Sequence, residues 1–197
     1  MKKIVTVLFT ASIIAQGAFS QTKTYPIRPQ ALGVNFILND FTTPYNIRTT
    51  SLASTINKKT YAKFSSMSPG LQLTYYKGLS PFVDFAGSLA GSFVQSNYVV
   101  KNASSDDQKF LMEADASLQA KLLPETYWVT PFASGGFGLS EFASHYGAFI
   151  PLGLGLKVNL FDEAAITIGS QYRIPVTTNT NGYHLMYSIG ISGLIGK

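Results

Sequence analysis

The sequence has no cysteine, which excludes disulfides, cysteine-ligated zinc and thiol catalysis from its chemistry. Charged residues are also scarce, at 13% of 197 residues, where soluble domains usually carry about 25%. Hydrophobic residues make up 46%, so the low charge does not mark a disordered chain. The formal net charge of +5 includes no run of more than two basic residues, which argues against nucleic-acid binding.

Long apolar runs are missing beyond the N-terminus. The best charge-free apolar stretch there, residues 147–156, is interrupted by Pro151 and three glycines. A membrane-spanning helix needs about 20 apolar residues, so any membrane crossing by this chain must use strands.

The N-terminus has the three parts of a secretory signal peptide. Lys2 and Lys3 precede the apolar stretch 4–14, and small residues at Ala18 and Ser20 predict cleavage before Gln21. We therefore expect a signal peptide at 1–20, a short periplasmic segment at 21–30, and a single β domain at 31–197.

The clearest periodicity is at residues 110–122, where every even position is apolar and most odd positions are polar. This period of two predicts a strand, because a helix would scatter Glu113, Asp115 and Lys121 over more than half of its circumference. The same criterion predicts eight strands in all. They are 31–40, 70–77, 81–94, 110–122, 127–138, 148–160, 164–173 and 183–195.

The connections between these strands alternate between long and short, including a long one at 139–146 that contains His145. An even number of strands with long loops at one end and tight turns at the other is typical of outer-membrane barrels. We therefore predict an all-β, eight-stranded, antiparallel, up-and-down transmembrane β-barrel.

The polar faces of the strands favour a membrane over a soluble fold. They consist mostly of Gly, Ser, Thr, Asn, Gln and Ala, with about one charge per strand, which suits the narrow lumen of an eight-stranded barrel. The polar face of a soluble sheet would carry more Lys, Glu and Asp. An exported soluble, lipocalin-like barrel that binds a small apolar ligand remains the main alternative.

Four segments resemble the OmpA-like outer-membrane β-barrel domain family. They are DFAGSLAG at 84–91, YWVTPF at 127–132, GAFIPLG at 147–153 and YHLMYSIG at 183–190. The resemblance implies an integral barrel of the cell outer membrane. It covers the barrel part only, because the sequence stops at Lys197 where many family members continue into a peptidoglycan-binding domain.

Catalytic and metal-binding motifs are sparse. The two histidines, His145 and His184, have no carboxylate at a ligand spacing beside them, so we expect no metal and no cofactor. Ser188 follows His184 on the same face at about 13 Å along a strand, too far for a direct hydrogen bond. We therefore expect no enzyme activity, although a lipid-modifying barrel enzyme stays open as a second alternative.

A set of charged residues should face the lumen. Because charges in a narrow, low-dielectric lumen must pair, we hypothesise that they form salt bridges and plug it, as the resemblance to OmpA-like barrels also implies. The alternative is that they stay hydrated and pair only loosely. Strand direction places one group towards the outer half and the other towards the periplasmic half, where Lys121 and Asp84 on neighbouring strands are the expected pair. The outer group is Glu113, Asp115, Arg173 and His184, and the periplasmic group is Asp84, Lys121 and Lys157.

The first long loop carries Arg48, Lys58, Lys59 and Lys63 with no acidic residue between them. This basic outer loop suggests contact with lipopolysaccharide phosphates or with a protein partner, and the alternative is a solvated loop without a binding role. The sequence thus predicts a small integral outer-membrane protein with a structural or surface-interaction role, a lumen filled by side chains, and outer-membrane lipid and lipopolysaccharide as its surroundings.

Overall fold

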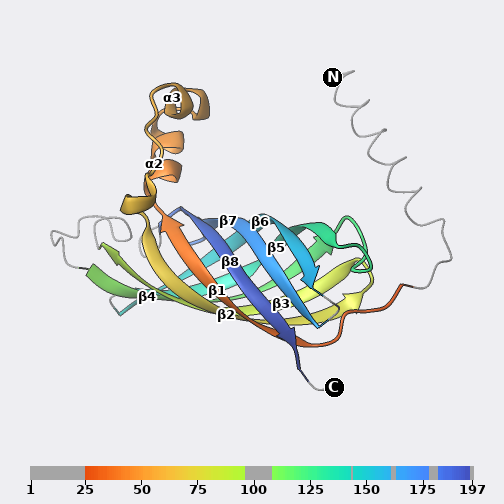
Figure 1. Cartoon of the computed structure of the whole chain (residues 1–197). Helices are drawn as coiled ribbons and strands as arrows, with labels where there is room; N and C mark the ends of the chain where they lie inside the picture. Colours follow the sequence, from red (N-terminus) through yellow and green to blue (C-terminus); the bar gives the residue numbers. More distant parts are fainter. Residues whose placement is uncertain (1–24, 96–107, 143, 161–162, 178–181, 196–197) are drawn as a thin grey trace.

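The computed structural model describes residues 25–95, 108–142, 144–160, 163–177 and 182–195. Within these residues, eight antiparallel strands pair in chain order and β8 pairs back onto β1, which closes one barrel (Figure 1). The strands are β1 (Ala31–Asp40), β2 (Ser68–Ser80), β3 (Val83–Gln95), β4 (Gln108–Lys121), β5 (Val129–Phe142), β6 (His145–Leu160), β7 (Ala164–Pro175) and β8 (His184–Leu194). The predicted eight-stranded up-and-down barrel is confirmed.

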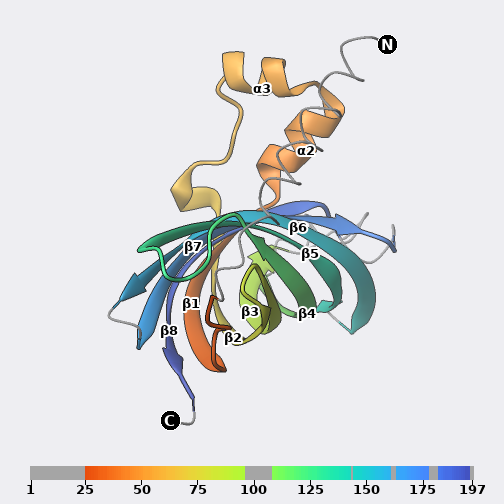
Figure 2. The same cartoon turned by 90° about the vertical axis from the view of Figure 1, so that its right-hand side faces the viewer.

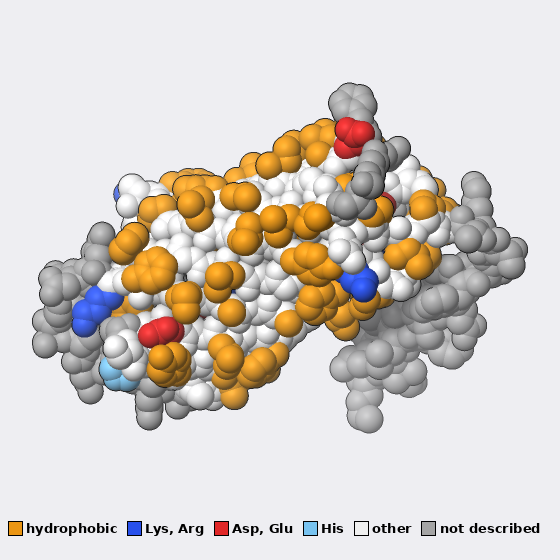
Figure 3. Space-filling model, turned by 90° about the horizontal axis from the view of Figure 1, so that it is seen from below, with side chains coloured by type: hydrophobic (Ala, Val, Ile, Leu, Met, Phe, Trp, Pro, Cys, Tyr) orange, Lys and Arg blue, Asp and Glu red, His pale blue; other side chains and the backbone are white. Residues whose placement is uncertain are grey.

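The two faces of the sheet differ as the period of two predicts. Along β6, Leu152, Leu154 and Leu156 point outward and are 48%, 71% and 45% exposed, whereas Lys157 points inward and is fully buried. Apolar side chains therefore cover the outside of the barrel wall, and charged side chains gather towards its two ends (Figure 3).

Glycines make room inside the narrow barrel. A Cβ atom on the inward-facing Gly136 would collide with the Ala116 carbonyl oxygen, and one on Gly190 would collide with the Asn35 side chain. Glycines on the inward face thus leave room for the backbone and side chains of the neighbouring strand inside the narrow barrel.

The two ends of the barrel are built differently. Both ends of the described chain lie at one end, which we call the terminus end. The other end carries residues 41–67, which we call the arm; it contains α2 (Thr42–Thr49), α3 (Leu52–Asn57) and the short 3-10 helix η1 (Phe64–Ser66). Viewed along the barrel, α2 and α3 extend sideways beyond the ring of strands (Figure 2). In the described part of the chain, no helix has the length and hydrophobicity to cross a membrane.

The prediction of a long loop at 139–146 is wrong. β5 runs on to Phe142, which pairs with His145 at the start of β6, and Ser144 in the connection has a φ of 65°. At the tip of this β5–β6 hairpin the polar side chain faces outward and the apolar one inward, the reverse of the rest of the barrel: Glu141 faces outward, while Phe142 faces inward and is 1% exposed. His145 is therefore a strand residue and not a loop residue, and the expected alternation of long and short connections is broken at this hairpin.

Candidate functional site: the charged interior of the barrel

One group of charged side chains lies inside the barrel near the arm end. Arg173 on β7 reaches across to two carboxylates on β4: its Nη1 atom lies 2.6 Å from Glu113 Oε2 and its Nη2 atom lies 3.1 Å from Asp115 Oδ2. His184 on β8 also approaches the Glu113 carboxylate, with its Nε2 atom 3.5 Å from Glu113 Oε2. The Ser88 hydroxyl donates to Asp115 Oδ2 at 2.7 Å. We call Glu113, Asp115, Arg173 and His184 the arm-end cluster.

An apolar layer covers this cluster on the side of the arm. It consists of Phe41, Val94, Leu111 and Phe142, each at most 5% exposed. Phe41, the first residue of the arm, stacks on the His184 ring at a centroid distance of 4.6 Å. The arm is thus joined directly to the packing of the lumen.

A second group of charges lies inside the terminus end. Asp84 on β3 accepts from Lys121 at 2.6 Å and from Lys157 at 2.8 Å, and all three side chains are at most 1% exposed. Glu125, in the connection between β4 and β5, lies 3.3 Å from Lys121 Nζ and 3.0 Å from Lys157 Nζ.

Arg28 completes this group from the segment that precedes β1. Its Nη1 atom lies 3.2 Å from Glu125 Oε1 and its Nη2 atom donates to Ser192 Oγ at 3.1 Å. We call the set the terminus-end cluster: Arg28, Asp84, Lys121, Glu125 and Lys157.

Each of the seven lumen charges proposed from the sequence thus lies in the interior, and the structure brings them into two separate clusters. Arg28 and Glu125 were missed because they lie outside the periodic segments. In the sequence each appears only as an isolated charged residue next to a strand end, and such residues are usually solvated, so nothing indicated that they lie inside the barrel.

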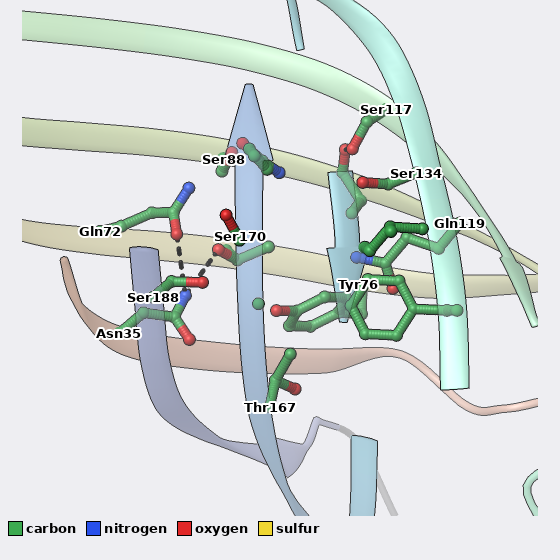
Figure 4. A pocket seen from close by; sticks show the side chains of 16 residues that line it. Asn35, Gln72, Tyr76, Ser88, Ser117, Gln119, Ser134, Thr167, Ser170 and Ser188 are labelled. Atoms are coloured by element: carbon green, nitrogen blue, oxygen red, sulfur yellow. Dashed lines mark hydrogen bonds between the residues drawn. The ribbon is translucent and has the colours of Figure 1, made fainter. Parts of the chain in front are cut away.

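A neutral polar chamber lies between the two clusters, since Ser117 and Gln119 line it and fall between Asp115 and Lys121 on β4. Figure 4 shows the side chains that line the chamber. Asn35 donates to Gln72 Oε1 at 3.2 Å and to Thr74 Oγ1 at 3.0 Å. Gln119 Oε1 and Thr167 Oγ1 are buried without a hydrogen-bond partner among the described residues. The free volume is about 30 Å³, enough for one or two water molecules to satisfy these groups.

The basic residues of the first loop lie on the arm and outside the barrel. Lys58, Lys59 and Lys63 are exposed, and the Arg48 guanidinium lies 3.4 Å from the centre of the Tyr183 ring. The described residues contain no group of three side chains suited to holding a metal ion.

Comparisons with known proteins show the same architecture. No protein-family model matches the sequence, and no curated protein matches it. Among solved structures, Neisserial surface protein A is 10% identical with a TM-score of 0.57, and the match covers 84% of this chain and 97% of that one. OprG from Pseudomonas aeruginosa is 12% identical with a TM-score of 0.52, covering 86% and 97%.

A third similar structure is Ail, the attachment invasion locus protein of Yersinia pestis. It is 11% identical with a TM-score of 0.50, and the match covers 85% of this chain and 99% of that one. At these identities the likeness concerns the fold alone. The chain has the fold of small outer-membrane barrels, as the resemblance to OmpA-like barrels implied.

Proposed function

We propose that this protein is an integral barrel of the outer membrane, with a lumen closed by side chains and a structural or surface-interaction role. The observation that carries the proposal is the reversed distribution of polarity: ion pairs lie inside the barrel, and rows of exposed leucine, isoleucine and phenylalanine lie outside. A surface of this kind is stable against lipid, whereas soluble proteins rarely expose apolar patches beyond a few hundred Å².

The proposal of a closed lumen is supported by four layers of side chains that fill the barrel. From the arm end inward, these are the apolar layer over His184, the arm-end cluster, the polar chamber and the terminus-end cluster. Ion pairs across a narrow lumen hold opposite walls together and leave no wide aqueous path. We therefore expect no large, stable pore.

The alternatives fit the interior less well. A lipocalin-like carrier needs an apolar cavity for its ligand, whereas the central chamber is polar and only about 30 Å³ in volume. A catalytic serine needs a base within hydrogen-bonding reach. His184 instead lies against Glu113 and Phe41. We therefore propose a protein without enzymatic activity.

The arm supports the surface-interaction part of the proposal. It combines four basic residues and no acidic residue, which suits anionic groups such as lipopolysaccharide phosphates or a protein partner. The similar barrel Ail has been solved with the heparin analogue sucrose octasulfate, so that barrel is known to take up a polyanion.

Cell fractionation and bilayer recording test the proposal together. We expect the protein in the outer-membrane fraction, with an electrophoretic mobility that changes on heating, as closed barrels show. Recovery of the native chain in the soluble periplasm would contradict membrane insertion. Large, long-lived conductance steps in planar bilayers would contradict the closed lumen.

Export through the signal peptide at 1–20 is part of the same proposal, and these residues lie outside the part of the chain that the structure describes. Intact-mass analysis of the purified protein should give a chain that begins at Gln21. A mass that still includes residues 1–20 would contradict cleavage.

A further inference from the structure

The arm has a direction as well as a charge. α2 and α3 extend to the side of the barrel, away from its long axis, instead of continuing in the direction of the strands (Figures 1 and 2). In a barrel that stands upright in a membrane, a sideways arm at the outer rim extends over the surrounding lipid.

The root of the arm lies where the apolar outer face ends. Phe36 and Leu38 are the last apolar outward-facing residues of β1. Asp40, the next residue on that face, is 1% exposed because the arm begins one residue later, and it accepts a hydrogen bond from the Thr43 amide at 2.9 Å. The arm therefore leaves the barrel at the level where hydrocarbon gives way to lipid headgroups.

The surface of the arm combines apolar and basic groups. Its exposed large hydrophobic side chains are Tyr45, Leu52, Ile56, Tyr61 and Phe64, and Phe64 is 80% exposed. Its charged side chains are all basic, and three of them are the exposed lysines Lys58, Lys59 and Lys63. Segments of this composition bind the interface of an anionic membrane, because apolar groups enter the headgroup layer while lysines pair with phosphates.

A groove at the root of the arm continues this surface onto the barrel wall. It has a volume of about 650 Å³ and lies between the arm and β8, with Phe64, Met67 and the outward-facing Tyr187 among its mainly apolar walls. Lys63 and the carboxylate of Asp40 also line it, and Asp40 is 1% exposed and accepts a hydrogen bond from the Thr43 amide. The mainly apolar walls of the groove suit a lipid acyl chain, and the exposed Lys63 can pair with a lipid phosphate above it.

Internal hydrogen bonds give the arm a defined shape. Asn46 Nδ2 donates to the Thr60 carbonyl oxygen at 2.6 Å, the Ala62 amide donates to Thr43 Oγ1 at 2.9 Å, and Ser51 caps α3 by accepting from the Ser54 amide at 3.1 Å. A preorganised arm loses less conformational entropy on binding than a disordered loop would.

We infer that the arm is a lateral foot that lies along the outer leaflet and binds the phosphate groups of the lipids around the barrel. This inference rests on the proposed insertion of the barrel in the membrane and names the partner of its basic loop. The foot fixes the height and tilt of the barrel in the bilayer and holds a layer of anionic lipid beside β1 and β8.

Spin labelling can test barrel insertion and arm position separately, because the chain contains no native cysteine that would also be labelled. A label at Ile56→Cys reports the position of α3, and a label at Leu154→Cys, on the outward face of β6, reports insertion of the barrel. Each variant is reconstituted into phosphatidylcholine vesicles with and without phosphatidylglycerol. Collisions of the label with oxygen and with a water-soluble nickel complex then give its depth.

We expect the label at position 154 to lie in the hydrocarbon of both kinds of vesicle. The label at 56 should be shielded from the nickel complex only when phosphatidylglycerol is present. Replacing Lys58, Lys59 and Lys63 together by glutamine should expose it again, with each lysine changing the ratio of bound to free arm about 5-fold. The matched control is Lys109→Gln, which removes an exposed lysine from β4 outside the arm and should have no effect.

Three outcomes would overturn the inference. If label 154 is in lipid while label 56 stays in water in every vesicle, the barrel is inserted and the foot does not exist. If label 56 is shielded in proportion to the protein-to-lipid ratio and regardless of lipid charge, a second copy of the chain covers the arm. If label 154 itself is in water, the proposed membrane insertion fails and the inference falls with it.

Discussion

The two ion clusters of the lumen differ in where their residues come from. The arm-end cluster is built from strand residues alone, on β4, β7 and β8. The terminus-end cluster adds Arg28 from the segment before β1 and Glu125 from a connection. The geometry of the arm-end cluster depends only on the register of the strands. The terminus-end cluster also binds two segments outside the strands to the barrel wall.

Their charge balance differs as well. Two carboxylates share one guanidinium and one imidazole in the arm-end cluster, whereas three bases share two carboxylates in the terminus-end cluster. The arm-end cluster thus relies on a single permanently charged base, Arg173, and the terminus-end cluster has redundant partners. The consequences of removing one member should therefore be unequal.

The largest effect is expected for Arg173→Met, which leaves Glu113 and Asp115 buried without their common cation. Breaking a buried ion pair in this way costs about 3–5 kcal/mol of unfolding free energy. Urea titration of the reconstituted protein, followed by the fluorescence of Trp128, the only tryptophan, measures the loss. The triple variant with Glu113→Gln and Asp115→Asn should recover most of it. A loss below about 1 kcal/mol for Arg173→Met would mean that the cluster is hydrated and loosely paired.

A smaller effect is expected for Asp84→Asn at the other end. Lys121 and Lys157 both lose a partner, but each keeps its contact with Glu125. The loss should be about 2 kcal/mol, typical of hydrogen bonds to charged groups. The same titration measures it, with Glu141→Gln on the outward face of β5 as a control. If Asp84→Asn costs more than Arg173→Met, the redundancy of the terminus-end cluster does not protect it.

The smallest effects should come from Arg28→Ala and Glu125→Gln. Glu125 is 15% exposed, so solvent screens its pairing with Arg28, and in Glu125→Gln both lysines keep Asp84 and the amide oxygen can still accept a hydrogen bond. Each change should therefore cost about 1 kcal/mol. In a double-mutant cycle the coupling between the two residues should shrink at high salt, while the cost of Arg173→Met should not. A coupling that is unaffected by salt would mean that the terminus end is as dry as the arm end.

The same contrast explains what the sequence could predict. Strand residues such as Glu113, Lys157 and Arg173 follow the period of two, so their inward direction could be inferred before any partner was known. Arg28 and Glu125 obey no period, and only the folded chain brings Glu125 to Lys157 and Arg28 to Glu125. The β5–β6 hairpin was misjudged for a related reason, since Phe142 turns inward to join the apolar layer and the polarity pattern reverses where the strand ends.

The arm shows another limit of sequence patterns. Its basic composition was evident, but neither charge nor periodicity could give its sideways direction. Phe41 joins the arm to the lumen by stacking on His184 and by packing with the apolar layer, and such contacts exist only in the folded chain. Composition thus predicted the kind of surface, and tertiary packing determined where the surface lies.

The ladder between β1 and β8 also has a consequence for assembly. Ala31 pairs with Leu194, so the first and last strands form the seam of the barrel. Of all the strand pairings, this one joins the partners that are farthest apart in the chain, and the loop that it closes is the entropically costliest. Until the seam forms, β1 and β8 present open edges on which another chain could pair. The seam is therefore the step at which a helper that shields strand edges would matter most.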